Sequence, residues 1–328
     1  MTINQASQAV ILSRRSLLRT SSIAAAAAML APRSLMAKSA NTLAQSPGLV
    51  EKARNSASLD KITVQHLRGN ISVLMGAGGN IAVLTGHDGK LLIDAGFAGA
   101  RPAISDALAS LGPDPIKHLI NTHWHFDHTD GNAWLHAAGA TILAHENTRK
   151  HLSVDTLVDG WDFTFKAAPA AAIPAQTFSS EHTVELNDET IALKHYAPAH
   201  TDSDISVHFT HADVFHTGDI WWNGYYPFLD YSTGGSIDGT IQAAEATLSK
   251  VTDKMTLVPG HGPVAGKAEL AHFRDVMVDI RTRVAALKKQ GKPLPEIIAA
   301  KPTAAYDAKW GGGFMSPSVF TALVYQGV

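Results

Sequence analysis

Three histidines and an aspartate stand close together in this 328-residue chain: His123, His125, Asp127 and His128. Packing several imidazoles and a carboxylate into a small space is costly unless their polar atoms find partners. A divalent cation provides such a partner, because imidazole nitrogen and carboxylate oxygen are good zinc ligands. The cluster follows an apolar run, residues 116–120, that predicts a buried strand. Loops at strand ends often carry active sites, so the cluster predicts a metal site.

Three further candidate ligands, His200, Asp219 and His261, follow in later parts of the chain. Each follows or closes an apolar segment and has Gly or Pro nearby. The chain contains no cysteine, which excludes disulfides, thiolate zinc sites and cysteine nucleophiles. Any zinc must therefore be held by histidine and carboxylate. Of the 17 histidines, the twelve outside these motifs are expected to be surface or packed residues.

Apolar runs separated by Gly and Asp turns predict β-strands, and 3.6-residue periodicity predicts helices between them. Each half of the chain has strands first and a helix later, which predicts one α/β/β/α sandwich. Residues 41–60 look like a polar lead-in, and residues 147–180 are either an inserted lid or a surface connection. The predicted strands are 71–75, 80–85, 90–94, 116–120, 141–144, 183–186, 190–194, 205–209, 214–216 and 255–258, and the predicted helices are 101–111, 131–139, 238–250 and 267–289.

Over residues 62–266 the motifs resemble those of the metallo-β-lactamase superfamily, in which His-x-His-x-Asp-His is followed by His, Asp and His. The resemblance implies an α/β fold, a four-layer αββα sandwich in a single domain with the metal site at one edge. It also implies a complete ligand set for two zinc ions. One zinc would be held by His123, His125 and His200, and the second by Asp127, His128 and His261, with Asp219 bridging both.

Two acidic residues refine this resemblance. Asp94 matches the family's first acidic motif, where a carboxylate orients ligand imidazoles. Asp219 makes the chain look more like glyoxalase II, lactonases and related hydrolases than like zinc β-lactamases, which usually lack an acid there.

The implied function is hydrolysis of a small molecule: an ester, thioester, lactone or lactam. Two zinc ions about 3.5–4 Å apart can hold a hydroxide nucleophile between them. Asp127 is the predicted catalytic residue, which would orient the nucleophile and pass a proton to the leaving group. Residues 76–79 are expected to form a hairpin tip above the metals, and Trp221 and Trp222 are the best candidates for a substrate wall among the aromatic residues.

Three alternatives stay open. One is β-lactamase activity, which Asp219 argues against as a main reaction. Another is a persulfide dioxygenase with a single iron on His123, His200 and Asp219, although the presence of Asp127, His128 and His261 speaks against it. The third is a zinc-binding protein without catalysis, for which so complete a ligand set is not needed.

The N-terminus resembles a twin-arginine export signal. Arg14 and Arg15 precede an apolar, alanine-rich stretch at residues 23–31, which is too short for a convincing membrane span. We therefore expect residues 1–40 to be a signal peptide and residues 41–328 a periplasmic or secreted domain, with no stable membrane insertion after signal removal. That domain would have 22 basic and 29 acidic residues, a formal charge of −7, which argues against nucleic-acid binding.

Overall fold

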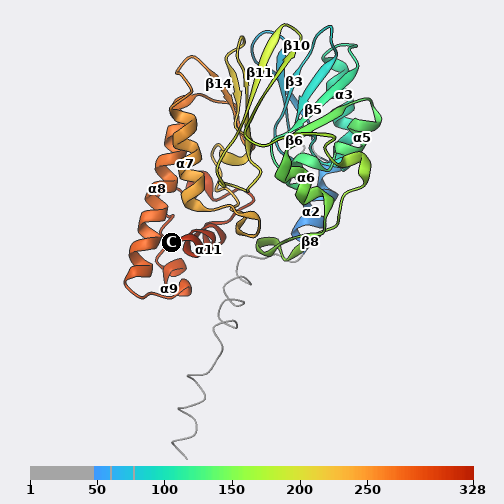
Figure 1. The fold of residues 1–328 in the computed structure, drawn as a ribbon. Coiled ribbons are helices and arrows are strands. Elements are labelled where there is room, and N and C mark those ends of the chain that lie inside the picture. The colour runs from blue at the N-terminus through green and yellow to red at the C-terminus, as the bar shows by residue number, and fades with distance from the viewer. Residues whose placement is uncertain (1–47, 60, 77) are drawn as a thin grey trace, which may run out of the picture. The chain divides into compact units, whose positions relative to one another are not determined.

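Two β-sheets lie face to face in the computed structural model of the chain, with helices on both outer sides (Figure 1). The structure describes residues 48–59, 61–76 and 78–328. The strands are β1 (Thr63–His66), β2 (Ile71–Met75), β3 (Ile81–Leu84), β4 (Lys90–Ile93), β5 (Ile116–Asn121), β6 (Thr141–His145), β7 (Thr156–Val158), β8 (Phe163–Phe165), β9 (Gln176–Phe178), β10 (Glu181–Leu186), β11 (Glu189–His195), β12 (Ile205–Phe209), β13 (Val214–His216) and β14 (Thr256–Val258).

The connections between strands explain the order within each sheet. The first sheet has the order β1-β2-β3-β4-β5-β6-β9, in which the first four strands pair antiparallel and the last three join in parallel. The second sheet has the order β10-β11-β12-β13-β14, and only β13 and β14 are parallel. Antiparallel partners need only short turns, whereas parallel partners need the longer crossovers that the helices supply.

Alternating side chains along the strands contribute to two separate hydrophobic layers, one between the two sheets and one between each sheet and its outer helices. In β2, Ile71 and Val73 face the second sheet, whereas Leu74 faces the outer helices. In β4, Leu92 likewise points outward while its neighbours Leu91 and Ile93 point between the sheets. Successive side chains of a strand point to opposite faces, so a fully apolar strand can serve both layers.

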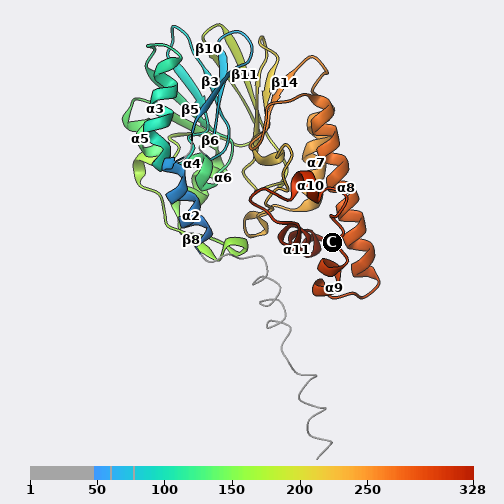
Figure 2. The ribbon, with the colours of Figure 1, turned by 180° about the vertical axis from the view of Figure 1, so that it is seen from behind.

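The helices cover the outer faces, as Figure 2 shows from behind. On α3, Ile104, Ala107 and Leu108 form a buried stripe with helical spacing, and α8 buries a similar stripe. The predicted αββα sandwich is thus confirmed. The helices are α2 (Leu49–Ser56), α3 (Arg101–Ser110), α4 (Phe126–Thr129), α5 (Asn132–Ala137), α6 (Glu146–Ser153), α7 (Ile237–Leu248), α8 (Lys267–Lys289), α9 (Leu294–Ala299), α10 (Asp307–Trp310) and α11 (Pro317–Gly327).

Two segments differ from the expectations. The lead-in at 41–60 contains helix α2, whose Arg54 guanidinium pairs with both carboxylate oxygens of Asp130 at 2.7 and 2.8 Å. Residues 147–180 contain most of α6 and the strands β7, β8 and β9 rather than an irregular loop. Trp161 and Phe165 from this segment are buried against other aromatic rings, so its aromatic residues do pack inward.

The predicted signal peptide, residues 1–40, lies outside the described residues. Those that are described belong to one compact unit, Leu43–Val328. Within it, every helix is too short or too polar to cross a lipid bilayer.

Candidate metal centre

The candidate ligands meet at one edge of the sandwich because each follows the end of a strand. His123 and His125 follow β5, His200 follows β11, and Asp219 and His261 follow β13 and β14. Parallel strands such as β13 and β14 end at the same edge, which brings the last two ligands together. The strand arrangement therefore brings candidate ligands that are up to 138 positions apart in the sequence to one site.

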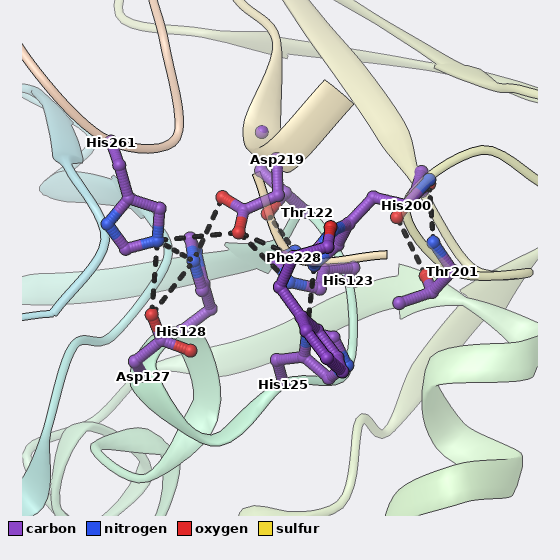
Figure 3. Close-up of polar contacts among 12 residues, drawn as sticks. Thr122, His123, His125, Asp127, His128, His200, Thr201, Asp219, Phe228 and His261 are labelled. Atoms are coloured by element: carbon purple, nitrogen blue, oxygen red, sulfur yellow. Dashed lines mark hydrogen bonds and ion pairs between the residues drawn. The ribbon is translucent and has the colours of Figure 1, made fainter. Parts of the chain in front are cut away.

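His123, His125 and His200 form the first group of ligand atoms (Figure 3). The Nε2 atom of His200 lies 2.8 Å from Nδ1 of His125, and all three imidazoles are fully buried. The His123 ring meets each of the other two edge-on, with centroids 4.9 Å apart. Three converging imidazole nitrogens are a common protein ligand set for zinc.

Asp127, His128 and His261 form the second group. The Nε2 atom of His261 lies 3.1 Å from Oδ2 of Asp127 and 3.4 Å from Nε2 of His128. This group is less enclosed than the first, because the side chains of Asp127 and His261 keep 15% and 19% of their surface exposed. The second group thus faces the solvent side of the site.

Asp219 lies between the two groups, as Figure 3 shows. Its Oδ2 atom is 3.4 Å from Nε2 of His200 and 3.3 Å from Nε2 of His261. Its Oδ1 atom is 3.1 Å from Nε2 of His128. The carboxylate therefore contacts imidazoles of both groups, as a bridging ligand would.

Two buried atoms indicate that these residues fit a metal. Nε2 of His123 and Oδ1 of Asp219 are inaccessible to solvent and make no hydrogen bond of acceptable geometry, although Oδ1 lies 3.1 Å from Nε2 of His128. Buried polar atoms without a partner are rare in folded proteins and call for an explanation. A cation bound by each group would pair both atoms, and the nitrogen and oxygen donors are those that zinc accepts.

Asp94 orients two ligands from beneath. Its Oδ2 atom accepts a hydrogen bond from Nδ1 of His128 at 2.8 Å and from the Thr122 hydroxyl at 2.7 Å. The Thr122 hydroxyl is in turn 3.0 Å from Nδ1 of His123. These contacts leave Nε2 of both imidazoles for a metal, which is the role that the sequence predicted for Asp94.

Asp230 is a positioning residue that sequence reasoning missed. Its Oδ2 atom lies 3.0 Å from Nε2 of His125, which leaves Nδ1 of that ring facing the metal site. Nearby, the Phe228 carbonyl accepts a hydrogen bond from Nδ1 of His200 at 2.8 Å. No motif surrounds Asp230, and its role depends on a loop that returns to the site from 105 residues along the chain.

Asp230→Asn should weaken metal binding at the first group by about 10- to 100-fold, because residues that orient ligands contribute this much. The amide oxygen can still accept from the Ser232 N–H, which donates to Oδ1 of Asp230. The amide nitrogen would then stand in the place of Oδ2 and could not accept from the Thr233 hydroxyl or the His125 imidazole. Competition with a chelator measures the affinity, and the exposed Asp253→Asn serves as control. An affinity equal to that of the control variant would show that Asp230 does not position His125.

The carboxylates also set the protonation of the second group. Burial alone would lower the pKa of His261, but Asp219 and Asp127 raise it to about 9. Against the same effect of burial, Asp219, Asp127 and Asp94 raise the pKa of His128 well above its ordinary value. In the metal-free protein these imidazoles therefore carry protons at neutral pH.

Metal binding should release protons, because a cation and a proton compete for the same imidazole nitrogen. With the pKa of His261 at about 9, loading at pH 7 should release about one proton from this residue. That contribution should disappear above the pKa, and affinity should fall as the pH is lowered. Calorimetry in buffers of different ionisation enthalpy measures the release; a proton count of zero at pH 7 would contradict the assignment.

A cavity of about 650 Å³ opens onto both groups of ligands. Trp222 lines it, with its ring 4.3 Å from that of His261, and Trp161 lines it beside His125. Trp221 does not line the cavity, since it is fully buried in the hydrophobic core and cannot serve as the predicted substrate wall there. Successive residues point in different directions at this turn, so only one of the two tryptophans reaches the site.

The sequence of the chain matches a family model over the part that carries this centre. The model describes the metallo-β-lactamase superfamily and matches residues 75–263. The chain belongs to this superfamily. The curated relative described below is a hydrolase. The matched range includes every candidate metal ligand.

Individual relatives are distant. The hydroxyacylglutathione hydrolase of Erythrobacter litoralis is 24% identical over 215 residues, which cover 60% of this chain and 74% of the relative. The sec-alkylsulfatase Pisa1 from Pseudomonas sp. superposes with a TM-score of 0.62 at 16% identity, over 81% of this chain and 50% of that one. A metallo-β-lactamase from Pontibacter korlensis gives 0.55 at 15% identity, over 67% of this chain and 100% of that one. The chain thus spans about half the length of the alkylsulfatase, and the structural likenesses show the shared fold.

Proposed function

We propose that this chain is a dinuclear zinc hydrolase that cleaves the acyl bond of an ester, thioester, lactone or lactam. The observation that carries the proposal is the pair of ligand groups, the first buried and the second partly exposed, with the Asp219 carboxylate between them. When bound, two divalent cations lower the pKa of a water molecule and polarise a carbonyl oxygen. No serine or cysteine nucleophile is then required.

Asp127 is the residue that we propose moves the proton. Its carboxylate belongs to the second ligand group and lines the cavity, so it can reach a substrate there. Burial alone would raise the pKa of Asp127, but the neighbouring His128 and His261 bring it below its usual range. An ionised carboxylate in this position can orient the attacking water, accept a proton from it and pass that proton to the leaving group.

The geometry favours this proposal over the alternatives. A single iron on His123, His200 and Asp219 would leave the second ligand group without a purpose, although that group is fully assembled. β-Lactams such as penicillins carry a carboxylate, and none of the cavity-lining residues in the described chain is Lys or Arg. A structural zinc protein has no use for a cavity that opens onto the ligands.

Purified full-length chain loaded with zinc should hydrolyse esters, thioesters or lactones and lose this activity when a chelator removes the metal. A panel that also contains a penicillin, a carbapenem and a secondary alkyl sulfate tests the substrate class directly. Efficient turnover of a β-lactam with little turnover of esters, thioesters or lactones would favour the β-lactamase alternative. Oxygen consumption with a glutathione persulfide would favour the iron alternative instead.

We also propose that residues 1–40 direct export by a twin-arginine route, which carries folded proteins and so suits a metal-loaded enzyme. Arg14 and Arg15 before an apolar stretch support this proposal. Replacement of both arginines by lysine should keep the protein in the cytoplasm. Cell fractionation measures the distribution, and unchanged export of the double variant would contradict the proposal.

A further inference from the structure

Five aromatic side chains form the wall of the cavity above the metal ligands: Phe97, Phe126, Trp161, Trp222 and Phe314. Three of them form a continuous layer, since Phe126 lies 5.4 Å from both Phe97 and Trp161, measured between ring centroids. Trp161 reaches the first ligand group at His125, and Trp222 reaches the second at His261. A substrate placed at either ligand group therefore meets an apolar surface.

The wall offers no positive charge to a substrate. Among the lining residues that the structure describes, the carboxylates and imidazoles of the ligands are the only ionisable groups. Arg54 is next to the lining residue Ala53 but is turned away, because its guanidinium is bound by Asp130 and lies 5.3 Å over the Phe126 ring. A carboxylate placed against this wall, away from the ligand groups, would lose water without gaining a counter-charge, which is costly.

Phe314 lies at the open side of the cavity. It belongs to the glycine-rich segment between α10 and α11 and remains 41% exposed, whereas Trp161 and Trp222 are 6% exposed. Burial of this exposed apolar surface by a bound substrate would contribute favourably to the free energy of binding. Phe314 lies outside residues 75–263, so the family model does not cover this part of the wall.

We propose that the substrate is an uncharged ester whose apolar acyl group lies against Phe314 and the aromatic wall. This inference rests on the proposed hydrolase function and names its substrate class. The enclosed part of the cavity measures about 200 Å³, below the range of about 300–1,000 Å³ for drug-sized ligands, and so suits a small ester. Phe314 then acts as a specificity-determining residue that touches the acyl chain and takes no part in bond cleavage.

Three p-nitrophenyl esters test the proposal on zinc-loaded full-length protein: the acetate, the hexanoate and the adipate monoester. The hexanoate and adipate chains have the same length and differ in a terminal carboxylate. Burial of a methylene group is worth up to about fourfold in kcat/KM. We expect the hexanoate to exceed the acetate by roughly tenfold or more, and the adipate to show no such gain.

Phe314→Ala should lower kcat/KM for the hexanoate by about three- to tenfold, mainly through KM, and lower it clearly less for the acetate. Its side chain is exposed, so the fold should tolerate the change. The matched control is Val278→Ala on α8, an apolar residue 38% exposed and outside the cavity. Phe314→Arg, which places a cation at the open side, should raise turnover of the adipate relative to the hexanoate.

Different experimental outcomes would overturn the substrate class and the hydrolase function. A faster reaction with the adipate than with the hexanoate, or an equal loss on both neutral esters in Phe314→Ala, would overturn the substrate class while leaving the hydrolase function in place. Absence of hydrolysis of all three esters by the zinc-loaded protein would overturn the ester substrate class. Absence of hydrolysis of thioesters, lactones and lactams as well would overturn the hydrolase function.

Discussion

Asp219→Asn should lower kcat/KM by about a thousandfold or more and reduce the number of metals bound per chain. The carboxylate lies within 3.4 Å of His128, His200 and His261, so its loss affects both ligand groups at once. Metal ions contribute several kcal/mol to the stabilisation of a hydrolytic transition state, and each 1.36 kcal/mol is a factor of ten. An amide keeps the size of the side chain but removes the charge that holds two cations close together.

Asp253→Asn controls for the loss of one negative charge, since this aspartate is exposed and precedes β14, whereas the ligand His261 follows that strand. Metal content by mass spectrometry and kinetics on the best ester of the panel give the two readouts. Full activity with an unchanged metal content in Asp219→Asn would show that this carboxylate does not bridge metals.

Gly79→Ala and Gly260→Ala should each lower activity by about a hundredfold with the fold retained. A Cβ atom at Gly79 would overlap the His128 ring, and one at Gly260 would overlap the Asp219 carboxylate. Neither glycine has a positive φ, so the effect comes from displaced ligands rather than backbone strain. Misplacement of a catalytic group by about 1 Å can cost a factor of about a hundred.

Gly266→Ala is the matched control, because a Cβ there meets only the Glu269 carboxylate, at 3.6 Å. Activity, metal affinity and thermal unfolding of the metal-free variants separate a ligand shift from a general loss of stability, since overpacking alone costs about 1–3 kcal/mol. Wild-type activity in both Gly79→Ala and Gly260→Ala would mean that the ligands can move freely, contrary to the packing described above.

The sequence predicted the ligands because their chemistry is local. His123, His125, Asp127 and His128 stand within six residues, and the remaining ligands follow strand ends that apolar patterns reveal. The same patterns predicted helix 267–289 with the bounds that α8 has, since its buried residues repeat at helical spacing. Periodicity also predicted all strands of the second sheet and β2 to β6 of the first to within one or two residues, but it missed the two edge strands β1 and β9 of the first sheet.

Parts of the site that depend on long-range packing could not be predicted. Asp230 reaches His125 and Phe314 reaches the cavity only because loops return to the metal edge, and no motif marks either residue. Helix α2 was missed because its short, polar sequence gives a weak pattern, yet Ala53 lines the cavity. Trp221 and Trp222 are adjacent and chemically alike, so only the folded backbone distinguishes the buried one from the one that lines the site.

The metal content of the protein tests the central claim most directly. Full-length protein purified without added metal should contain about two zinc ions per chain by mass spectrometry, and removal of both should abolish ester hydrolysis until zinc is restored. About one iron per chain, with oxygen consumed in the presence of a persulfide, would contradict the dinuclear hydrolase and favour sulfur oxidation at His123, His200 and Asp219.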